Sequence, residues 1–206
     1  MPTLLQIESS PSPYSVSREL TAEYVKKWKE ANPQGTVVVR DLVQNPPAPV
    51  NAAWIGAAYV PKDARTAEQN AALSASDELI DELFSADEIL IGVAMHNFSI
   101  PSTLKLWIDQ VVRVGRTFNA GPEGYAGLVT GKKATIVQAS GADFSEGSPF
   151  ASYNHADPYL GAVLGFLGVT DVKVIRAGGT RVLFSPDTDR AAFLKPVIEK
   201  LDAVFA

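Results

Sequence analysis

The chain has 206 residues, a net charge of −5 and no cysteine, and 46% of its residues are hydrophobic. This composition is typical of a soluble globular protein. It excludes disulfides and thiolate catalysis and offers no basic stripe for nucleic acid. No apolar run is long enough for a membrane span and the N-terminus does not resemble a signal peptide, so we expect one cytoplasmic domain over residues 1–206.

The N-terminal part of the chain alternates apolar runs with amphipathic stretches. Thr3–Glu8 predicts a first strand, followed by a loop rich in serine and proline. Ser15 is a suitable N-cap for the next helix. The apolar face of that helix is formed by Leu20, Tyr24, Val25 and Trp28. Thr36–Val39 predicts a second strand, and residues 42–65 form a long connection that is either functional or disordered.

The rest of the chain continues this alternation. Thr66–Phe84 has a helical pattern, Glu88–Val93 predicts a buried central strand, and Pro101 suits the start of a helix. The buried face of that helix is formed by Leu104, Trp107, Ile108, Val111 and Val112. The remaining predicted elements are strands Lys132–Gln138 and Val172–Arg176, a helix Tyr159–Gly168 between them, and a last helix over about Asp187–Val204.

Strands that alternate with helices at these spacings predict a parallel sheet covered on both faces. We therefore expect an α/β fold, a doubly wound five-stranded parallel sheet in a three-layer α/β/α sandwich. In such sheets ligands bind outside the carboxyl ends of the strands, where the strand order reverses. The loops after the first, third and fourth strands are the places to look for chemistry.

The loop after the first strand contains Ser9, Ser10, Ser12, Ser15 and Ser17. Hydroxyls and amide N–H groups at a helix N-terminus form a site for a phosphate dianion. The loop lacks the glycine motifs of dinucleotide and nucleoside-triphosphate sites. From the loop alone, a phosphate site and a solvated loop whose serines cap the helix remain alternatives.

The loop after the third strand, Met95–Pro101, combines an aromatic side chain, an amide and backbone N–H groups. A flat heteroaromatic ring would find apolar contact for its face and hydrogen bonds for its rim there. Ordinary loop packing of Met95 and Phe98 is the alternative. His96 and His155 are the only histidines, and a lone histidine does not predict a metal site.

Small residues follow the fourth strand at Ala139–Ala142. Glycine and alanine let the backbone approach a ligand closely, and amides there would stabilise negative charge on a reduced flavin. A plain tight turn is the alternative. Together the three loops outline a phosphate site, a ring platform and a backbone clamp at one edge of the sheet, which predicts a flavin mononucleotide (FMN) site.

Seven motifs resemble the FMN-dependent NADH-azoreductases, in the same order along nearly the whole chain. They are Ser9-Ser10 with Ser15-Val16-Ser17, Met95–Pro101, Leu104–Asp109, Arg113–Phe118, Leu128–Lys133, Gln138–Gly141 and Phe166–Val172. The segment from Met95 to Phe118 is the most specific. The resemblance implies a flavodoxin-like fold, non-covalent FMN, NADH or NADPH as electron donor, and a homodimer with active sites at the subunit interface.

The resemblance also implies roles for particular residues. The phosphate would be held by Ser10, Ser15, Val16 and Ser17, the flavin ring would be lined by Met95, His96, Asn97 and Phe98, and its other edge would be closed by Ala139, Ser140, Gly141 and Ala142. Phe118 matches an aromatic position beside the substrate pocket. The chain departs from the family at His96, where tyrosine is frequent, and at Ala142, where a second glycine is common.

The implied activity is the two-electron, ping-pong reduction of quinones and aromatic azo compounds. NADH or NADPH would reduce FMN and leave, and the acceptor would then take two electrons in the same place. No catalytic side chain is expected, because the flavin carries the chemistry. A non-catalytic flavodoxin-like electron carrier and a redox-linked regulator are the alternatives. Neutral loops around the predicted site, and segments 42–65 and 113–130 that could wall a pocket, favour the enzyme.

Overall fold

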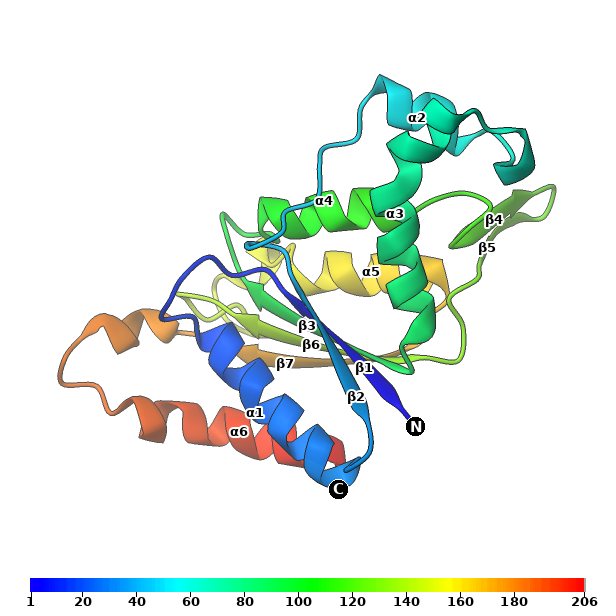
Figure 1. Cartoon of the computed structure of the whole chain (residues 1–206). Helices are drawn as coiled ribbons and strands as arrows, with labels where there is room; N and C mark the ends of the chain where they lie inside the picture. Colours follow the sequence, from blue (N-terminus) through cyan, green and yellow to red (C-terminus); the bar gives the residue numbers. More distant parts are fainter. Residues whose placement is uncertain (206) are drawn as a thin grey trace.

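The computed structural model describes residues 1–205 and is built on a five-stranded parallel sheet with the strand order β2-β1-β3-β6-β7 (Figure 1). The strands are β1 (Thr3–Glu8), β2 (Thr36–Asp41), β3 (Glu88–Ala94), β6 (Lys133–Ala139) and β7 (Asp171–Ala177). The chain first runs outward from β1 to β2 and then crosses back to β3 on the other side of β1. The strand order therefore reverses between β1 and β3, which confirms the predicted doubly wound sheet.

Five long helices cover the two faces of the sheet. They are α1 (Val16–Ala31), α3 (Ala67–Ser85), α4 (Ser102–Val111), α5 (Asp157–Leu167) and α6 (Arg190–Phe205). In Figure 1, α1 and α6 lie on one face and α3, α4 and α5 lie on the other, giving three layers. Ser15 caps α1 as predicted, because its side chain accepts a hydrogen bond from the Arg18 N–H. Within residues 1–205, no helix combines the length and apolarity needed to cross a membrane.

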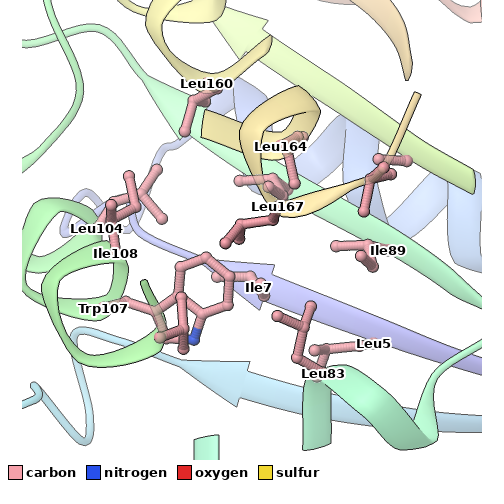
Figure 2. Packing of buried hydrophobic residues seen from close by; sticks show 14 of the residues in the cluster. Leu5, Ile7, Leu83, Ile89, Leu104, Trp107, Ile108, Leu160, Leu164 and Leu167 are labelled. Carbon is pink, nitrogen blue, oxygen red and sulfur yellow. The ribbon is translucent and has the colours of Figure 1, made fainter. Parts of the chain in front are cut away.

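Successive side chains of each strand point to opposite faces of the sheet and pack into two separate hydrophobic cores. Ile89 and Ile91 of β3 pack under α3, α4 and α5, whereas Leu90 packs under α1 and α6. Figure 2 shows the first core, where Trp107 of α4 lies among aliphatic side chains of the strands and of α5. Burying each large apolar side chain contributes about 1.5–3 kcal/mol. The sheet is therefore held from both sides, and its edge can carry loops that do not contribute to packing.

The structure contains short elements that the sequence pattern did not predict. They are α2 (Ala52–Ala58), the 3₁₀ helices η1 (Lys62–Ala64), η2 (Ala151–Tyr153) and η3 (Thr180–Phe184), and a hairpin of β4 (Phe118–Gly121) and β5 (Gly124–Gly127). Residues 42–65 are thus ordered: Asn51 caps α2, and the Trp54 indole N–H donates to the Gln110 side chain at 2.8 Å. In the hairpin, Gly127 packs directly against the backbone at the end of α5.

We predict that Gly127→Ala destabilises the protein by about 1–3 kcal/mol, because its Cβ would overlap the backbone of Leu167 and Gly168. Gly121→Ala in the same hairpin is the matched control, since a Cβ there meets no atom within 4 Å. Thermal unfolding of the two variants checks this. Equal melting temperatures for the two would show that the hairpin does not pack on α5 as described.

Candidate functional site

The carboxyl ends of β1, β3 and β6 are neighbours at the reversal of strand order. Two hydrogen bonds tie the loops that leave them. The Ser9 hydroxyl donates to the Gly92 carbonyl of β3 at 2.7 Å, and the Met95 N–H donates to the Ala139 carbonyl of β6 at 2.8 Å. The three loops that the sequence singled out therefore start from one short stretch of the sheet edge.

The loop after β1 leads into the N-terminus of α1. Ser10 is 1% exposed, and its hydroxyl is buried with no hydrogen-bond partner among the described residues. The N–H groups of Val16 and Ser17 are the first of the helix and have no acceptor within it. A buried hydroxyl without a partner and free helix amides together match the donors that a phosphate dianion needs.

The loop after β3 is a tight turn with unusual backbone angles. His96 and Ser99 exchange backbone hydrogen bonds of 2.9 and 3.0 Å, and Asn97 and Phe98 between them have φ of +47° and +72°. Two successive positive φ values are typical of a type I′ turn, which suits asparagine but costs phenylalanine of order 1 kcal/mol or more. Such strain is retained most often at functional sites.

The loop after β6 is anchored to the segment that follows β7. The Ser140 carbonyl accepts hydrogen bonds from the N–H and hydroxyl of Thr180 at 3.0 and 3.1 Å, and the Gly141 carbonyl accepts from the Arg181 N–H at 3.2 Å. The Gly141 N–H bonds to no protein group in the described part of the chain, and a Cβ on Gly141 would meet nothing within 4 Å. This glycine therefore leaves both a free donor and open space.

These loops enclose a cavity of about 350 Å³, which we call the switch-point pocket. Its volume is within the range of roughly 300–1,000 Å³ typical of small-molecule sites. Of the predicted site residues, those that line it are Ser10, Ser15, Val16, Met95, His96, Ala139, Ser140 and Gly141. Ser17 is fully buried with its hydroxyl 3.0 Å from that of Ser15. Asn97, Phe98 and Ala142 belong to the same loops but do not line the pocket.

The sequence reasoning missed one wall of the pocket. Thr180, Leu183 and Phe184 of η3 and Arg190 of α6 line its far side, and Ser12, Tyr14 and Ala94 complete it. In Figure 1 the blue loop before α1 and the orange segment before α6 lie at the same end of the sheet. Gly178 and Gly179, which follow β7 at this edge, were the available signal. They give the chain the freedom to turn back over the pocket, Gly179 with φ of +72°.

Phe118 lies in β4, outside the switch-point pocket. Its ring packs against those of Phe166 and Tyr125, at centroid distances of 4.8 and 5.9 Å. It therefore contributes to an aromatic cluster on the α5 side of the molecule. Its assignment to a substrate pocket stays a prediction.

A larger and more open hollow of about 580 Å³ lies between α4 and α5, on the other side of the Phe98 turn. It is lined by Ser99, Ile100, Lys105, His155, Pro158 and Tyr159. Two hydrogen bonds connect it to the turn through His155, whose backbone N–H donates to the Phe98 carbonyl at 2.9 Å and whose carbonyl accepts from the Ser99 hydroxyl at 3.3 Å. The first turn of α5 lines this hollow through Pro158, which has no N–H, and Tyr159. The smaller pocket has the free amides of α1 together with the unpartnered Ser10 hydroxyl, so it fits a phosphorylated ligand better.

A buried carboxyl lies at the end of β1, next to the loop that leads into the pocket. Glu8 is 3% exposed, and burial raises its pKa although hydrogen bonds from Thr21 and Gln6 oppose the shift. Its second oxygen has no partner and lies where a Cβ on Gly92 would come within 2.7 Å. Arg18 lowers this pKa and Asp41 raises it through their charges. Burial at the sheet edge thus favours the neutral, protonated form of Glu8.

Comparison with known proteins places this architecture among relatives. A family model described as having a flavodoxin-like fold matches residues 2–201. An FMN-dependent NADH:quinone oxidoreductase from Acidobacterium capsulatum is 58% identical over 201 residues, covering 98% of both proteins. A protein of the same name from Nostoc punctiforme is 47% identical over 178 residues, covering 86% of this chain and 87% of the relative. The crystal structure of an azoreductase from Bacillus anthracis has a TM-score of 0.88 at 27% identity, covering 99% of this chain and 98% of that one.

The fold and the site define a doubly wound α/β protein with a pocket of small-molecule size at the strand reversal. By its family match and its close relatives, the chain belongs to the flavodoxin-like family that includes the FMN-dependent NADH:quinone oxidoreductases. This confirms the family and the fold that the sequence motifs suggested.

We predict that Glu8→Gln changes how stability depends on pH. Because the pKa of Glu8 is raised in the folded state, the folded protein holds more protons than the unfolded chain above about pH 4.3, and stability falls as pH rises from there through the folded pKa. The glutamine variant loses this slope. The difference between its melting temperature and that of the native protein should therefore change in favour of the variant as the pH rises from 5 to 8.

Glu30→Gln, an exposed change on α1, is the control and should leave the pH profile unaltered. A melting-temperature difference between Glu8→Gln and the native protein that stays constant from pH 5 to pH 8 would contradict the burial argument.

Proposed function

We propose that this protein is an FMN-dependent NAD(P)H oxidoreductase that reduces quinones and aromatic azo compounds by two-electron, ping-pong transfer. The observation that carries the proposal is the switch-point pocket, which is lined at the N-terminus of α1 by Ser10, whose buried hydroxyl has no hydrogen-bond partner among the described residues. The names of relatives that align over nearly the whole chain support it. We also infer that residues 1–206 act as one domain, and that it works in the cytoplasm, where a nicotinamide donor is available.

In this proposal three loops hold the parts of FMN. The loop after β1 and the first turn of α1, with Ser10, Ser15, Val16 and Ser17, bind the phosphate. The turn Met95–Phe98 contacts the flavin ring from one side, and Ala139–Ala142 closes its other edge. The match between donor type and ligand supports this assignment: free amides and a hydroxyl for a dianion, and a strained turn with apolar neighbours for a flat ring.

When bound, FMN supplies the hydride and electron chemistry between the nicotinamide and the aromatic acceptor. The residues of the chain would orient the bound FMN and stabilise its reduced form. The free Gly141 N–H would be a fixed donor to the ring and would stabilise the negative charge that a reduced flavin carries. Leu183 and Phe184 of η3 line the pocket and would give a bound flavin apolar contact. In this proposal no side chain acts as a nucleophile.

A homodimer is part of the same proposal. Two aromatic clusters on the α4 and α5 side contain exposed side chains. In one, the exposed Phe98 and Tyr153 pack beside the buried Phe144. In the other, the exposed Tyr125 and Phe166 pack beside the half-buried Phe118. Tyr125 is 72% exposed and Phe98 is 48% exposed. Exposed apolar patches of this kind are typical of protein contact sites. In such a dimer, Phe118 of one protomer would border the acceptor site of the other.

We predict that Ser10→Ala weakens FMN binding about tenfold, because one hydrogen bond to a charged group is lost. The same change should not destabilise the protein without flavin, because it removes a buried hydroxyl that has no partner. Ser74→Ala, at an exposed position of α3 that does not line the pocket, is the control. Fluorescence titration with FMN and thermal unfolding measure both effects, and loss of stability without loss of affinity would contradict the assignment.

The activity itself is tested by steady-state oxidation of NADH with a quinone as acceptor, using the FMN-loaded protein and no added reductase. We expect sustained turnover with both a quinone and an azo dye, with parallel lines in double-reciprocal plots because donor and acceptor use the same place in turn. Binding of FMN with no turnover would favour an electron carrier. A protein that ignores FMN would exclude both.

A further inference from the structure

Arg18 connects three elements at the phosphate end of the switch-point pocket. Its Nε donates to the Ser10 carbonyl at 2.8 Å, and its two terminal nitrogens donate to the two carboxylate oxygens of Asp41 at 2.9 Å each. The planar guanidinium group is thereby fixed in orientation. Arg18 itself is not among the residues that line the pocket.

Asp41 is a rigid support for this arginine. It ends β2, and its Oδ1 also accepts the N–H groups of Val43 and Gln44 at 2.9 and 3.3 Å. Pairing with Arg18 lowers the pKa of Asp41 and pairing with Asp41 raises that of Arg18. The side chains are only 29% and 22% exposed, so the pair stays charged and connected over the working pH range.

The Arg18–Asp41 pair fixes the orientation of the Ser10 carbonyl. Pro11 follows Ser10, so the peptide group between them has a carbonyl but no N–H. Among the described residues, the hydrogen bond that this peptide group makes is the one its carbonyl accepts from Arg18. A carbonyl oxygen turned into the pocket would repel a phosphate dianion, whereas a carbonyl held by the Arg18 guanidinium keeps this partial negative charge away from the dianion.

We propose that Arg18, supported by Asp41, is a positioning residue that holds the Ser10 carbonyl out of the phosphate site and so makes the protein select FMN over riboflavin. The inference rests on the proposed function and adds a residue that does not touch the ligand. If the pair merely joined α1 to β2, its removal would instead lower the stability of the protein and weaken the binding of FMN and riboflavin equally.

The test compares dissociation constants for FMN and riboflavin, which differ only in the phosphate, by flavin fluorescence. In Arg18→Met we expect FMN binding to weaken about tenfold or more, the size of a lost charge-assisted contact, with riboflavin binding changed less than about twofold. Arg18→Lys keeps the charge but not the three-way geometry, and should show most of the same loss. Asp41→Asn, which leaves Arg18 without its carboxylate, should shift the ratio in the same direction.

Arg40→Met is the matched control. Arg40 of β2 also bonds two carboxylates, those of Glu82 and Glu78 on α3, and its side chain is 19% exposed, but it does not line the pocket. Its loss should lower stability and leave the ratio of FMN to riboflavin affinity unchanged.

The possible outcomes separate the inference from the function on which it rests. Native protein that binds neither flavin, or binds both equally, contradicts the phosphate site itself. Native protein that prefers FMN, with Arg18→Met and Asp41→Asn keeping that preference, overturns the role of Arg18. Full preference in Arg18→Lys overturns positioning in favour of charge alone. If Arg18→Met fails to fold, the lysine and asparagine variants decide between these results.

Discussion

Parallel pairing of β1 with β3, and of β3 with β6, is the constraint on which the site depends. Because parallel strands end at the same edge, their three following loops must leave the sheet side by side. The reversal of order between β1 and β3 sends the crossover helices to opposite faces and leaves the edge uncovered. Residues more than 80 positions apart in the sequence, such as Ser10 and Met95, therefore line one pocket. Each loop can supply a different chemical group.

The same edge carries the polar groups and strained backbone that packing alone would remove. The Ser10 hydroxyl and one oxygen of Glu8 are buried without partners, and Asn97 and Phe98 adopt positive φ. Two aliphatic cores hold the sheet from both faces, so these costs do not unfold the protein. A bound ligand with a phosphate would satisfy the hydroxyl, and the Arg18–Asp41 pair keeps the loop in the orientation that allows it.

The five strands of the sheet and the five long helices were predictable because their apolar periodicity and caps are local signals, as at Ser15 and along Glu88–Val93. The three loops could be assigned to one edge because parallel topology places strand ends together. The β4–β5 hairpin and α2 could not be predicted, since each is too short for a periodic pattern to emerge. The pocket wall formed by Thr180, Phe184 and Arg190 was missed for another reason. These residues follow a turn at Gly178 and Gly179, and the direction in which that turn sends the chain depends on tertiary contacts.

The central claim is that the three loops bind one FMN molecule, and a titration of isotope-labelled protein with FMN, followed by two-dimensional amide NMR spectra, tests it most directly. The account predicts that the amide signals of Val16, Ser17, Met95 and Gly141 shift together and saturate at one FMN per chain. Shifts confined to one of the three loops, or centred on the hollow between α4 and α5, would contradict it.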